Sequence, residues 1–224
     1  MLLYLHGFRS SPQSFKARLV QERMREWGVG RYYACPVLNV SPAQAIAQAE
    51  AAIAASQAGG AQPLTIIGSS LGGFYARWLA ERHGCRAVLL NPAVHPWTDL
   101  ERHLGDQPLW HGGGSVRVER HHLDELLALR VEPITRPQRY FLMAATGDEV
   151  LDYREMLAAF PGAHTRVIEG SDHGISEFAD YVDEVLAFCG YGPDGQVSQV
   201  SQVSQVSQVS QVSQVSPIDP EPQA

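Results

Sequence analysis

The chain has 224 residues, of which 45% are hydrophobic and 18% charged, and its formal net charge is −7. These values are typical of a soluble globular chain with one good-sized domain, and the negative charge argues against nucleic acid as a partner. No apolar run approaches the roughly 18 to 20 residues of a membrane-spanning helix, and no signal-peptide pattern follows Met1, so we expect a cytoplasmic protein without a membrane span.

Six short apolar runs predict six β-strands, with helical patterns between them. The runs are Leu2–Leu5, Tyr32–Val37, Leu64–Ile67, Ala87–Leu90, Tyr140–Ala144 and Thr165–Ile168. Strands that alternate with helices favour a parallel sheet that is covered by helices on both faces. The predicted fold class is therefore α/β, with a mostly parallel sheet of about six strands.

Three helices carry clear boundary signals in the sequence. The first is predicted over about 12–27, with Ser11 as its N-cap and a proline in its first turn. The second begins at Ser41-Pro42-Ala43-Gln44, which has the capping-box pattern, and ends at Gly59-Gly60. The last is predicted over about 177–188, where apolar side chains recur at helical spacing.

The regular alternation fades within the segment 93–137. We expect this insert to form a small helical cap, with two short helices at about 98–104 and 121–129 joined by a glycine-rich loop. Ligands of open α/β folds bind at the carboxyl edge of the sheet, so the cap is predicted to lie over that edge.

The C-terminal part of the sequence is repetitive. From Gln196 to Ser216 the triplet Gln-Val-Ser occurs seven times, without a charged or aromatic residue. Burial of one modest apolar residue in three does not offset an ordering cost of roughly 1 to 2 kcal/mol per residue. We therefore expect a folded domain over 1–192 and a disordered low-complexity tail over 193–224.

Cysteine and lysine usage gives no functional signal at this stage. Cys35, Cys85 and Cys189 are far apart and form no C-x-x-C pair, which predicts reduced thiols. The histidines lack a carboxylate or cysteine framework at metal-ligand spacing, so we predict no metal site. Lysine occurs only once, as Lys16, beside abundant arginine, and we attribute this to base composition and assign the residue no role.

The clearest chemical motif is Gly68-Ser69-Ser70-Leu71-Gly72, which lies directly between a predicted strand and a helical run. A G-x-S-x-G motif in this context is typical of the nucleophile elbow of α/β-hydrolases. The two glycines leave room for the close backbone approach that such a tight turn requires. Ser70 is the predicted nucleophile, in a strained backbone conformation.

A serine nucleophile needs a base and a carboxylate downstream in this chain order. His173 follows the last predicted strand and is the candidate base. Asp148 directly follows the preceding strand and is the candidate acid, with Asp152 and Asp172 as alternatives. We prefer Asp148 because Asp152 should cap the next helix and Asp172 is an immediate neighbour of His173.

Backbone amides are expected to form the oxyanion hole. The loop at His6-Gly7-Phe8 follows the first strand, and its Phe8 amide is one predicted donor, with the Leu71 amide as the other. His6 is interpreted as a residue that shapes this loop through hydrogen bonds. His111-Gly112-Gly113-Gly114 resembles an oxyanion motif but comes after the nucleophile, so we interpret it as a flexible loop.

Aromatic and aliphatic residues near these motifs could form an apolar wall beneath the cap. Phe74 and Trp97 are our predicted substrate-binding residues. The full predicted wall comprises Phe8, Phe74, Trp97, Leu100 and Trp110.

Several motifs occur together in a familiar order. They are Leu2-Leu3-Tyr4-Leu5-His6-Gly7-Phe8 with Ser10-Ser11-Pro12, Gly68-Ser69-Ser70-Leu71-Gly72-Gly73, Asn91-Pro92-Ala93-Val94, Thr146-Gly147-Asp148-Glu149-Val150-Leu151-Asp152-Tyr153-Arg154, and Val167-Ile168-Glu169-Gly170 before His173. Over roughly residues 2–190 the chain resembles the YqiA-type bacterial esterases, a small α/β-hydrolase family. The resemblance implies the α/β-hydrolase fold and carboxylic-ester hydrolysis, with nucleophile, acid and base at Ser70, Asp148 and His173.

We therefore expect a serine esterase that works through an acyl-enzyme intermediate on a small-molecule acyl ester or thioester, without a cofactor. One alternative is a thioesterase, another serine hydrolase or an acyltransferase. A second alternative is a non-catalytic binding protein with the same fold, although such proteins usually lack a triad member and none is missing here.

Overall fold

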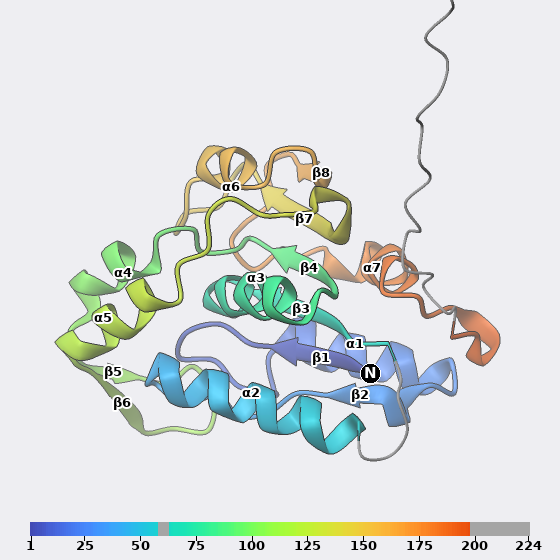
Figure 1. The fold of residues 1–224 in the computed structure, drawn as a ribbon, viewed down its shortest axis with the longest axis horizontal. Coiled ribbons are helices and arrows are strands. Elements are labelled where there is room, and N and C mark those ends of the chain that lie inside the picture. Colours follow the sequence, from blue (N-terminus) through green and yellow to red (C-terminus); the bar gives the residue numbers. More distant parts are fainter. Residues whose placement is uncertain (58–62, 198–224) are drawn as a thin grey trace, which may run out of the picture.

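The computed structural model describes residues 1–57 and 63–197 (Figure 1). Its main sheet has six strands in the order β2-β1-β3-β4-β7-β8, and every neighbouring pair is parallel. These strands are β1 (Leu2–Leu5), β2 (Tyr33–Ala34), β3 (Thr65–Ser69), β4 (Arg86–Leu90), β7 (Tyr140–Ala145) and β8 (His164–Ile168). Each of the six predicted strands is present, and the predicted parallel α/β fold is confirmed.

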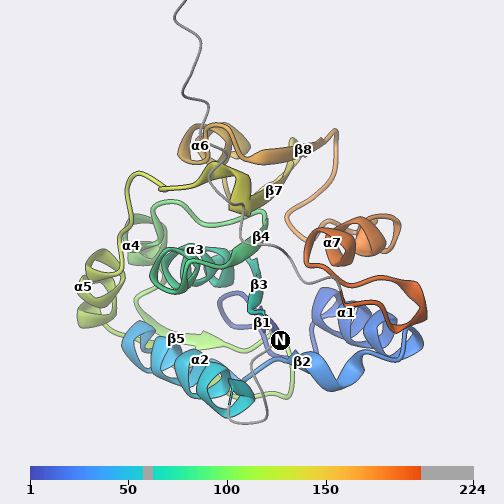
Figure 2. The same cartoon turned by 45° about the vertical axis from the view of Figure 1, so that its right-hand side comes forward.

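Helices cover both faces of this sheet (Figure 2). Helices α1 and α7 lie on one face, and α2, α3 and α6 lie on the other. Helices α4 and α5 lie beyond the carboxyl ends of the strands (Figure 1). Their bounds are α1 (Phe15–Glu26), α2 (Pro42–Gln57), α3 (Leu71–His83), α4 (Pro96–Asp99), α5 (Arg120–Ala128), α6 (Tyr153–Ala159) and α7 (Val182–Phe188).

The strand order creates a reversal between β1 and β3. The chain first moves outward from β1 to β2, and then crosses back to continue through β3, β4, β7 and β8 in the opposite direction. Because crossovers between parallel strands are right-handed, α1 and α3 must cover opposite faces. At such a reversal the loops after the two strands separate and leave a crevice at the carboxyl edge of the sheet.

Alternation along the strands divides the core into two apolar clusters. In β1, Leu2 and Tyr4 pack with α1 and α7, whereas Leu3 and Leu5 pack with α2 and α3. All four side chains are buried because successive strand residues point to opposite faces and both faces are covered. This explains why the inner strands β1, β4 and β7 are continuously apolar rather than alternating, apart from Arg86 at the start of β4.

The predicted start of the first helix is wrong by one turn. Helix α1 begins at Phe15 with Ser14 at the N-cap, not with Ser11. Ser11 instead accepts hydrogen bonds from Gln13 N through its hydroxyl (3.1 Å) and from Ser14 N through its carbonyl (3.0 Å). Pro12 therefore occupies the second position of a β-turn, where its fixed φ is equally favourable.

Two other elements are shorter than predicted. Strand β2 covers only Tyr33–Ala34, and Pro36, which has no N–H to donate, follows it closely. The predicted last helix is divided into a 3-10 turn at Phe178–Asp180 and helix α7. The proposed end of α2 at Gly59-Gly60 lies outside the residues that the structure describes.

The insert contains a hairpin that we did not predict. Strands β5 (Gly105–Pro108) and β6 (Ser115–Val118) pair antiparallel between a 3-10 turn at Leu100–His103 and helix α5. The glycines at 112, 113 and 114 all have positive φ, which lets the chain reverse between the strands. Strand β5 reads Gly-Asp-Gln-Pro, so it lacks the apolar alternation that would indicate a strand.

At the end of the described residues the chain forms a 3-10 turn at Pro193–Gly195 and a β-bridge between Tyr191 and Val197. The rest of the proposed tail lies outside the described residues.

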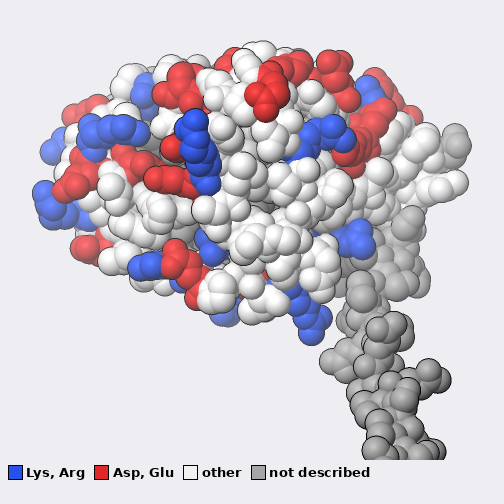
Figure 3. All heavy atoms as spheres, turned by 90° about the horizontal axis from the view of Figure 1, so that it is seen from above, with Lys and Arg blue, Asp and Glu red and all other residues white. Residues whose placement is uncertain are grey.

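Of the helices in 1–57 and 63–197, none is long and apolar enough to cross a membrane. On the face in Figure 3, acidic and basic side chains are interspersed around a largely uncharged centre.

The close approach of α3 to β1 predicts a strong effect of Gly72→Ala. A Cβ at Gly72 would lie 2.1 Å from the carbonyl oxygen of Leu5. Overpacking should lower the free energy of unfolding by about 3 kcal/mol, although alanine gains about 1 kcal/mol of helix propensity. Urea denaturation of the wild type and the variant measures this difference in the free energy of unfolding. Gly192→Ala is the control, because its nearest neighbour would lie at 3.9 Å; equal stability of the two variants would contradict the packing argument.

Candidate active site

The turn between β3 and α3 presents Ser70 at the carboxyl edge of the sheet. Ser70 has φ 56° and ψ −122°, a conformation that costs a non-glycine residue about 1–3 kcal/mol. Its backbone is held in place by hydrogen bonds from Ser70 N to Leu90 O (3.0 Å) and from Ala93 N to Ser70 O (3.1 Å). The predicted strained backbone at Ser70 is confirmed.

Glycines permit the close packing around this turn. A Cβ at Gly68 would lie 2.2 Å from the carbonyl oxygen of Gly72, so the two ends of the turn are nearly in contact. A Cβ at Gly7 would lie 3.1 Å from the Ser70 Cβ and 3.6 Å from Ser70 Oγ. The loop after β1 therefore lies directly against the Ser70 side chain.

His173 is oriented by a buried carboxylate. Its Nδ1 lies 2.8 Å from Asp148 Oδ2, and the Asp148 side chain is 0% exposed while that of His173 is 22% exposed. A carboxylate can only accept, so Nδ1 donates this hydrogen bond, and in the neutral imidazole Nε2 is then the acceptor. The other Asp148 oxygen accepts from Val150 N (2.8 Å) and Leu151 N (2.9 Å), which satisfies the buried group.

The two alternative acids have other partners. Asp152 caps α6 by accepting from Arg154 N (2.8 Å), as predicted. Asp172 accepts from the backbone and hydroxyl of Ser176 (3.0 and 2.6 Å), and the hydroxyl bond lowers the pKa of Asp172. The histidine loop thus brings only Asp148, among these three, into contact with the ring.

Sequence reasoning missed two residues that hold this loop. Asn91, fully buried at the end of β4, donates to the carbonyls of Asp172 (3.2 Å) and His173 (3.1 Å) and accepts from Ala145 N (2.8 Å). Glu149 accepts from His173 N (3.0 Å). The only sequence signal for these two residues was their position: Asn91 directly follows a strand, and Glu149 lies a few residues after the next strand of the sheet.

Lys16 provides a third hold on the same loop. Its ammonium donates to the carbonyl of Gly174 at 2.7 Å, although the residue is only 9% exposed. Burial lowers the pKa of Lys16 to about 8, and the nearby Asp172 and Asp148 act in the opposite direction. A buried lysine beside the histidine loop was not expected from the sequence.

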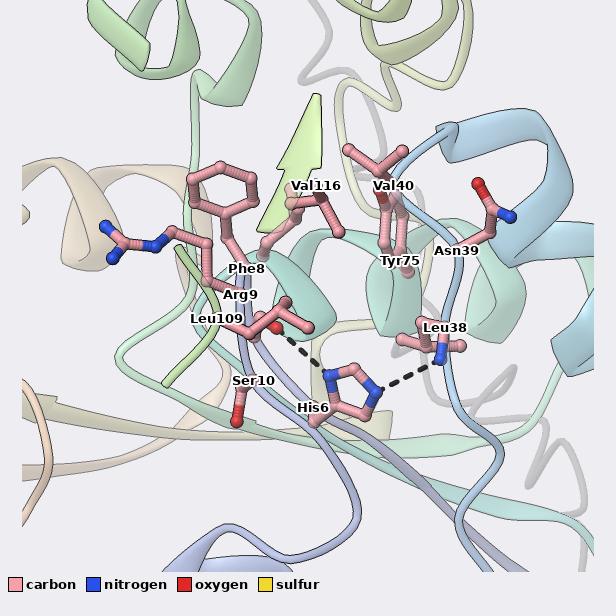
Figure 4. Close-up of a pocket in the computed structure, with 12 residues that line it drawn as sticks. His6, Phe8, Arg9, Ser10, Leu38, Asn39, Val40, Tyr75, Leu109 and Val116 are labelled. Carbon is pink, nitrogen blue, oxygen red and sulfur yellow. Dashed lines mark hydrogen bonds between the residues drawn. The ribbon is translucent and has the colours of Figure 1, made fainter. Parts of the chain in front are cut away.

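The loop after β1 is shaped by His6, as predicted (Figure 4). His6 Nε2 accepts from Leu38 N (3.1 Å), so the proton lies on Nδ1, which donates to Gly7 O (3.0 Å). Burial lowers the pKa of His6, which favours this neutral form. Neither Phe8 N nor Leu71 N donates a hydrogen bond within the described part of the chain, so both amides are free to bind a ligand oxygen.

Ser70 and His173 line one cavity of about 500 Å³. This volume is typical of small-molecule sites. Phe8, Phe15 and Trp110 contribute apolar surface to it. Trp110 belongs to the insert, and its backbone amide donates a hydrogen bond to Arg9 O (2.9 Å), which holds it beside the loop after β1. Within the residues described, no hydrogen bond joins Ser70 to His173; such bonds often form only when substrate is bound.

The structure does not bring the predicted substrate-binding pair to this cavity. Phe74 is buried and packs edge-on against Trp97, with ring centroids 6.1 Å apart. Phe74 belongs to the core cluster that includes α3, and Trp97, a partly buried residue of the insert, packs against that cluster. Leu100 lines a separate small cavity with Phe8.

A metal centre has no support in the geometry. In the ranges 1–57 and 63–197, no group of three or more His, Cys, Asp or Glu side chains is placed to hold a metal ion.

The parallel sheet, its reversal between β1 and β3 and the strained turn at Ser70 are the features of the α/β-hydrolase fold. The model of the family described as "Uncharacterised protein family (UPF0227)" matches residues 1–190, and the chain belongs to this family. This is the YqiA-like family, so the predicted resemblance is confirmed.

Solved structures similar to this chain include esterases. Est1E from Butyrivibrio proteoclasticus is 15% identical over 85% of this chain and 88% of its own, with a TM-score of 0.61. Est1E with ferulic acid bound gives 15% identity, a TM-score of 0.61 and coverage of 83% and 88%. The esterase domain of a Rhodothermus marinus protein is 22% identical over 83% of each chain, with a TM-score of 0.59. At these identities the similarity shows the fold.

The bridge made by Asn91 predicts a large cost for Asn91→Ala. The substitution leaves the Ala145 amide and two loop carbonyls without their partner, and should lower the free energy of unfolding by about 2–4 kcal/mol. Hydrogen exchange at the Ala145 amide should also accelerate. Asn39→Ala is the control, because exposed Asn39 accepts from Ser41 N where water can replace it. If both variants unfold alike, the bridge does not stabilise the site.

Proposed function

We propose that the protein is a serine esterase that hydrolyses carboxylic esters through an acyl-enzyme intermediate, with Ser70 as nucleophile, His173 as base and Asp148 as the acid that orients the base. The observation that supports this most is the 2.8 Å contact between His173 Nδ1 and the fully buried Asp148 carboxylate, on the wall of the cavity that also exposes Ser70. The esterases among the structurally similar proteins agree with this class.

In the proposed reaction, Ser70 Oγ attacks the ester carbonyl carbon while its proton moves to His173 Nε2. The charge that develops on the imidazolium is stabilised by Asp148. The tetrahedral intermediate then collapses, the bond to the leaving oxygen breaks, and His173 returns the proton to the leaving alcohol. Water attacks the acyl-enzyme by the same route, giving its proton to His173, and releases the acid and Ser70.

The oxyanion is proposed to bind the Phe8 and Leu71 amides. Leu71 directly follows the nucleophile, and Phe8 belongs to the loop that lies against the Ser70 side chain. Their unused N–H groups supply two hydrogen bonds that grow stronger as negative charge develops on the carbonyl oxygen. Removal of one such donor typically costs about 10²- to 10³-fold in rate.

Hydrolysis of a thioester is the second candidate chemistry, because the same groups attack either carbonyl. Est1E, which has this fold, binds ferulic acid, a type of product that hydrolysis of either an ester or a thioester releases. The esterases among the structurally similar proteins favour the ester as the first class of compound to test.

The nucleophile assignment predicts covalent labelling of the protein by a fluorophosphonate probe at Ser70. Ser70→Ala should not be labelled and should lose about 10⁶-fold in kcat for 4-nitrophenyl butyrate. Labelled peptides identified by mass spectrometry measure the first effect. Ser115→Ala, on the exposed strand β6, is the matched control and should be labelled like the wild type. Folded wild-type protein that stays unlabelled would support a non-catalytic binding protein instead.

The acid assignment predicts a graded effect among three aspartates. Asp148→Asn should lower kcat by about 10⁴-fold, because the amide would favour the wrong imidazole tautomer. Asp152→Asn and Asp172→Asn should each lower it by less than about tenfold, since their carboxylates have other partners. A loss at Asp172→Asn as large as that at Asp148→Asn would contradict the assignment.

A further inference from the structure

The cavity beside Ser70 and His173 contains one buried cation. Lys16, the only lysine of the chain, lines this cavity and is bonded to Gly174, the residue after His173. The ammonium therefore lies against the loop that carries the proposed base, and both residues line the same cavity. One of its three N–H groups is used by the Gly174 carbonyl.

No carboxylate neutralises this cation at close range. Among the described residues, Lys16 forms no ion pair within 4.0 Å, and no Asp or Glu lines the cavity. The two acids that influence it are engaged elsewhere, since Asp148 accepts from His173 and two amides and Asp172 accepts from Ser176. A buried charge without a counter-charge is costly, which indicates that the site is completed by an anion.

Hydroxyl groups extend the polar side of the same wall. Ser14 and Ser176 line the cavity with Lys16, and the Ser14 hydroxyl makes no capping bond to α1. Phe15 and Trp110 supply apolar surface to the same cavity. The Ser176 hydroxyl gives its proton to Asp172, so Ser14 is the hydroxyl donor of this pair that a ligand could use. The cavity thus combines one cation, a hydroxyl donor and aromatic surface in a protein whose net charge is −7.

We propose that Lys16 binds a negatively charged group of the substrate, so that the enzyme prefers esters that carry a carboxylate close to the scissile bond. This inference rests on the proposed esterase function and names its substrate class. The carboxylate can belong to the acyl part or to the alcohol part of the ester, and the two cases share the same contact with the ammonium.

The alternative role for Lys16 is purely structural, because its bond to Gly174 also holds the histidine loop. Lys16→Met leaves the Gly174 carbonyl without this partner in either case, so the melting temperature does not separate the two roles. A lysine that only holds the loop would cause an equal loss of activity on all esters when it is replaced. A lysine that also binds the substrate would cause a larger loss on the anionic esters.

The first test compares matched pairs of esters at pH 7. The acyl pair is 4-nitrophenyl hemiglutarate and its methyl ester, and the alcohol pair is 4-carboxyphenyl butyrate and its methyl ester. For at least one pair, the ratio of kcat/KM for the anionic to the neutral ester should be at least about tenfold higher in wild type than in Lys16→Met or Lys16→Gln. The responding pair tells which part of the substrate carries the anion.

Controls separate this result from general damage. Arg18→Gln removes an exposed cation from the same helix and should keep the wild-type ratio. The ratio should also fall as pH rises through about 8, because Lys16 loses its charge there and the two esters of a pair otherwise meet the same catalytic groups. Unchanged ratios in both lysine variants, or equal losses on anionic and neutral esters, would overturn the inference.

A second test does not depend on catalysis. Because lysine occurs once, ¹³C-labelled lysine gives a single NMR signal that reports the titration of Lys16. In Ser70→Ala, the anionic ester of the responding type at saturation, monomethyl glutarate or 4-carboxyphenyl butyrate, should raise the pKa of Lys16, whereas its methyl ester should not. The absence of a difference between the anionic and the neutral compound for both types would overturn the inference. Failure of the proposed function would appear separately, as wild-type protein that the fluorophosphonate does not label.

Discussion

The close contact between the end of β1 and the start of α3 is the constraint on which the rest of the site depends. Gly68 and Gly72 allow the β3–α3 turn to close until backbone atoms touch, and Gly7 allows the next loop to lie against Ser70. The same contact strains Ser70 and exposes its hydroxyl at the reversal of strand order. Without these three glycines, neither the serine nor the free amides beside it could occupy their positions.

A second constraint acts on the histidine loop, which has little secondary structure of its own. Four side chains from three parts of the fold hold it: Asn91 after β4, Asp148 and Glu149 after β7, and Lys16 on α1. Each contact uses either a buried group or a charge, so the imidazole is positioned by the framework rather than by its own loop. The lysine is the exception in electrostatic terms, because its bond to a carbonyl leaves its charge without a counter-charge.

The sequence predicted the parts of the fold that depend on local patterns. Continuous apolar runs located all six strands of the sheet, and the G-x-S-x-G motif located the strained turn at Ser70. The hairpin β5–β6 was not predicted because Gly105–Pro108 has no apolar alternation. The predicted start of α1 was one turn too early because Pro12 suits a turn as well as the first turn of a helix. Asn91, Glu149 and Lys16 could not be predicted, since their roles arise from contacts between elements that are distant in the sequence. For the same reason the sequence did not reveal that Phe74 and Trp97 pack against each other and do not line the cavity beside Ser70.

The central claim is that Ser70, His173 and two backbone amides act together on one carbonyl group. The most direct measurement is a crystal structure of the protein after reaction with a 4-nitrophenyl alkylphosphonate, which mimics the tetrahedral intermediate. The account predicts phosphorus bonded to Ser70 Oγ, with one phosphonate oxygen about 2.7–3.1 Å from both Phe8 N and Leu71 N, and another within hydrogen-bond distance of His173 Nε2. An adduct on a different residue, or a phosphonate oxygen that points away from both amides, would contradict it.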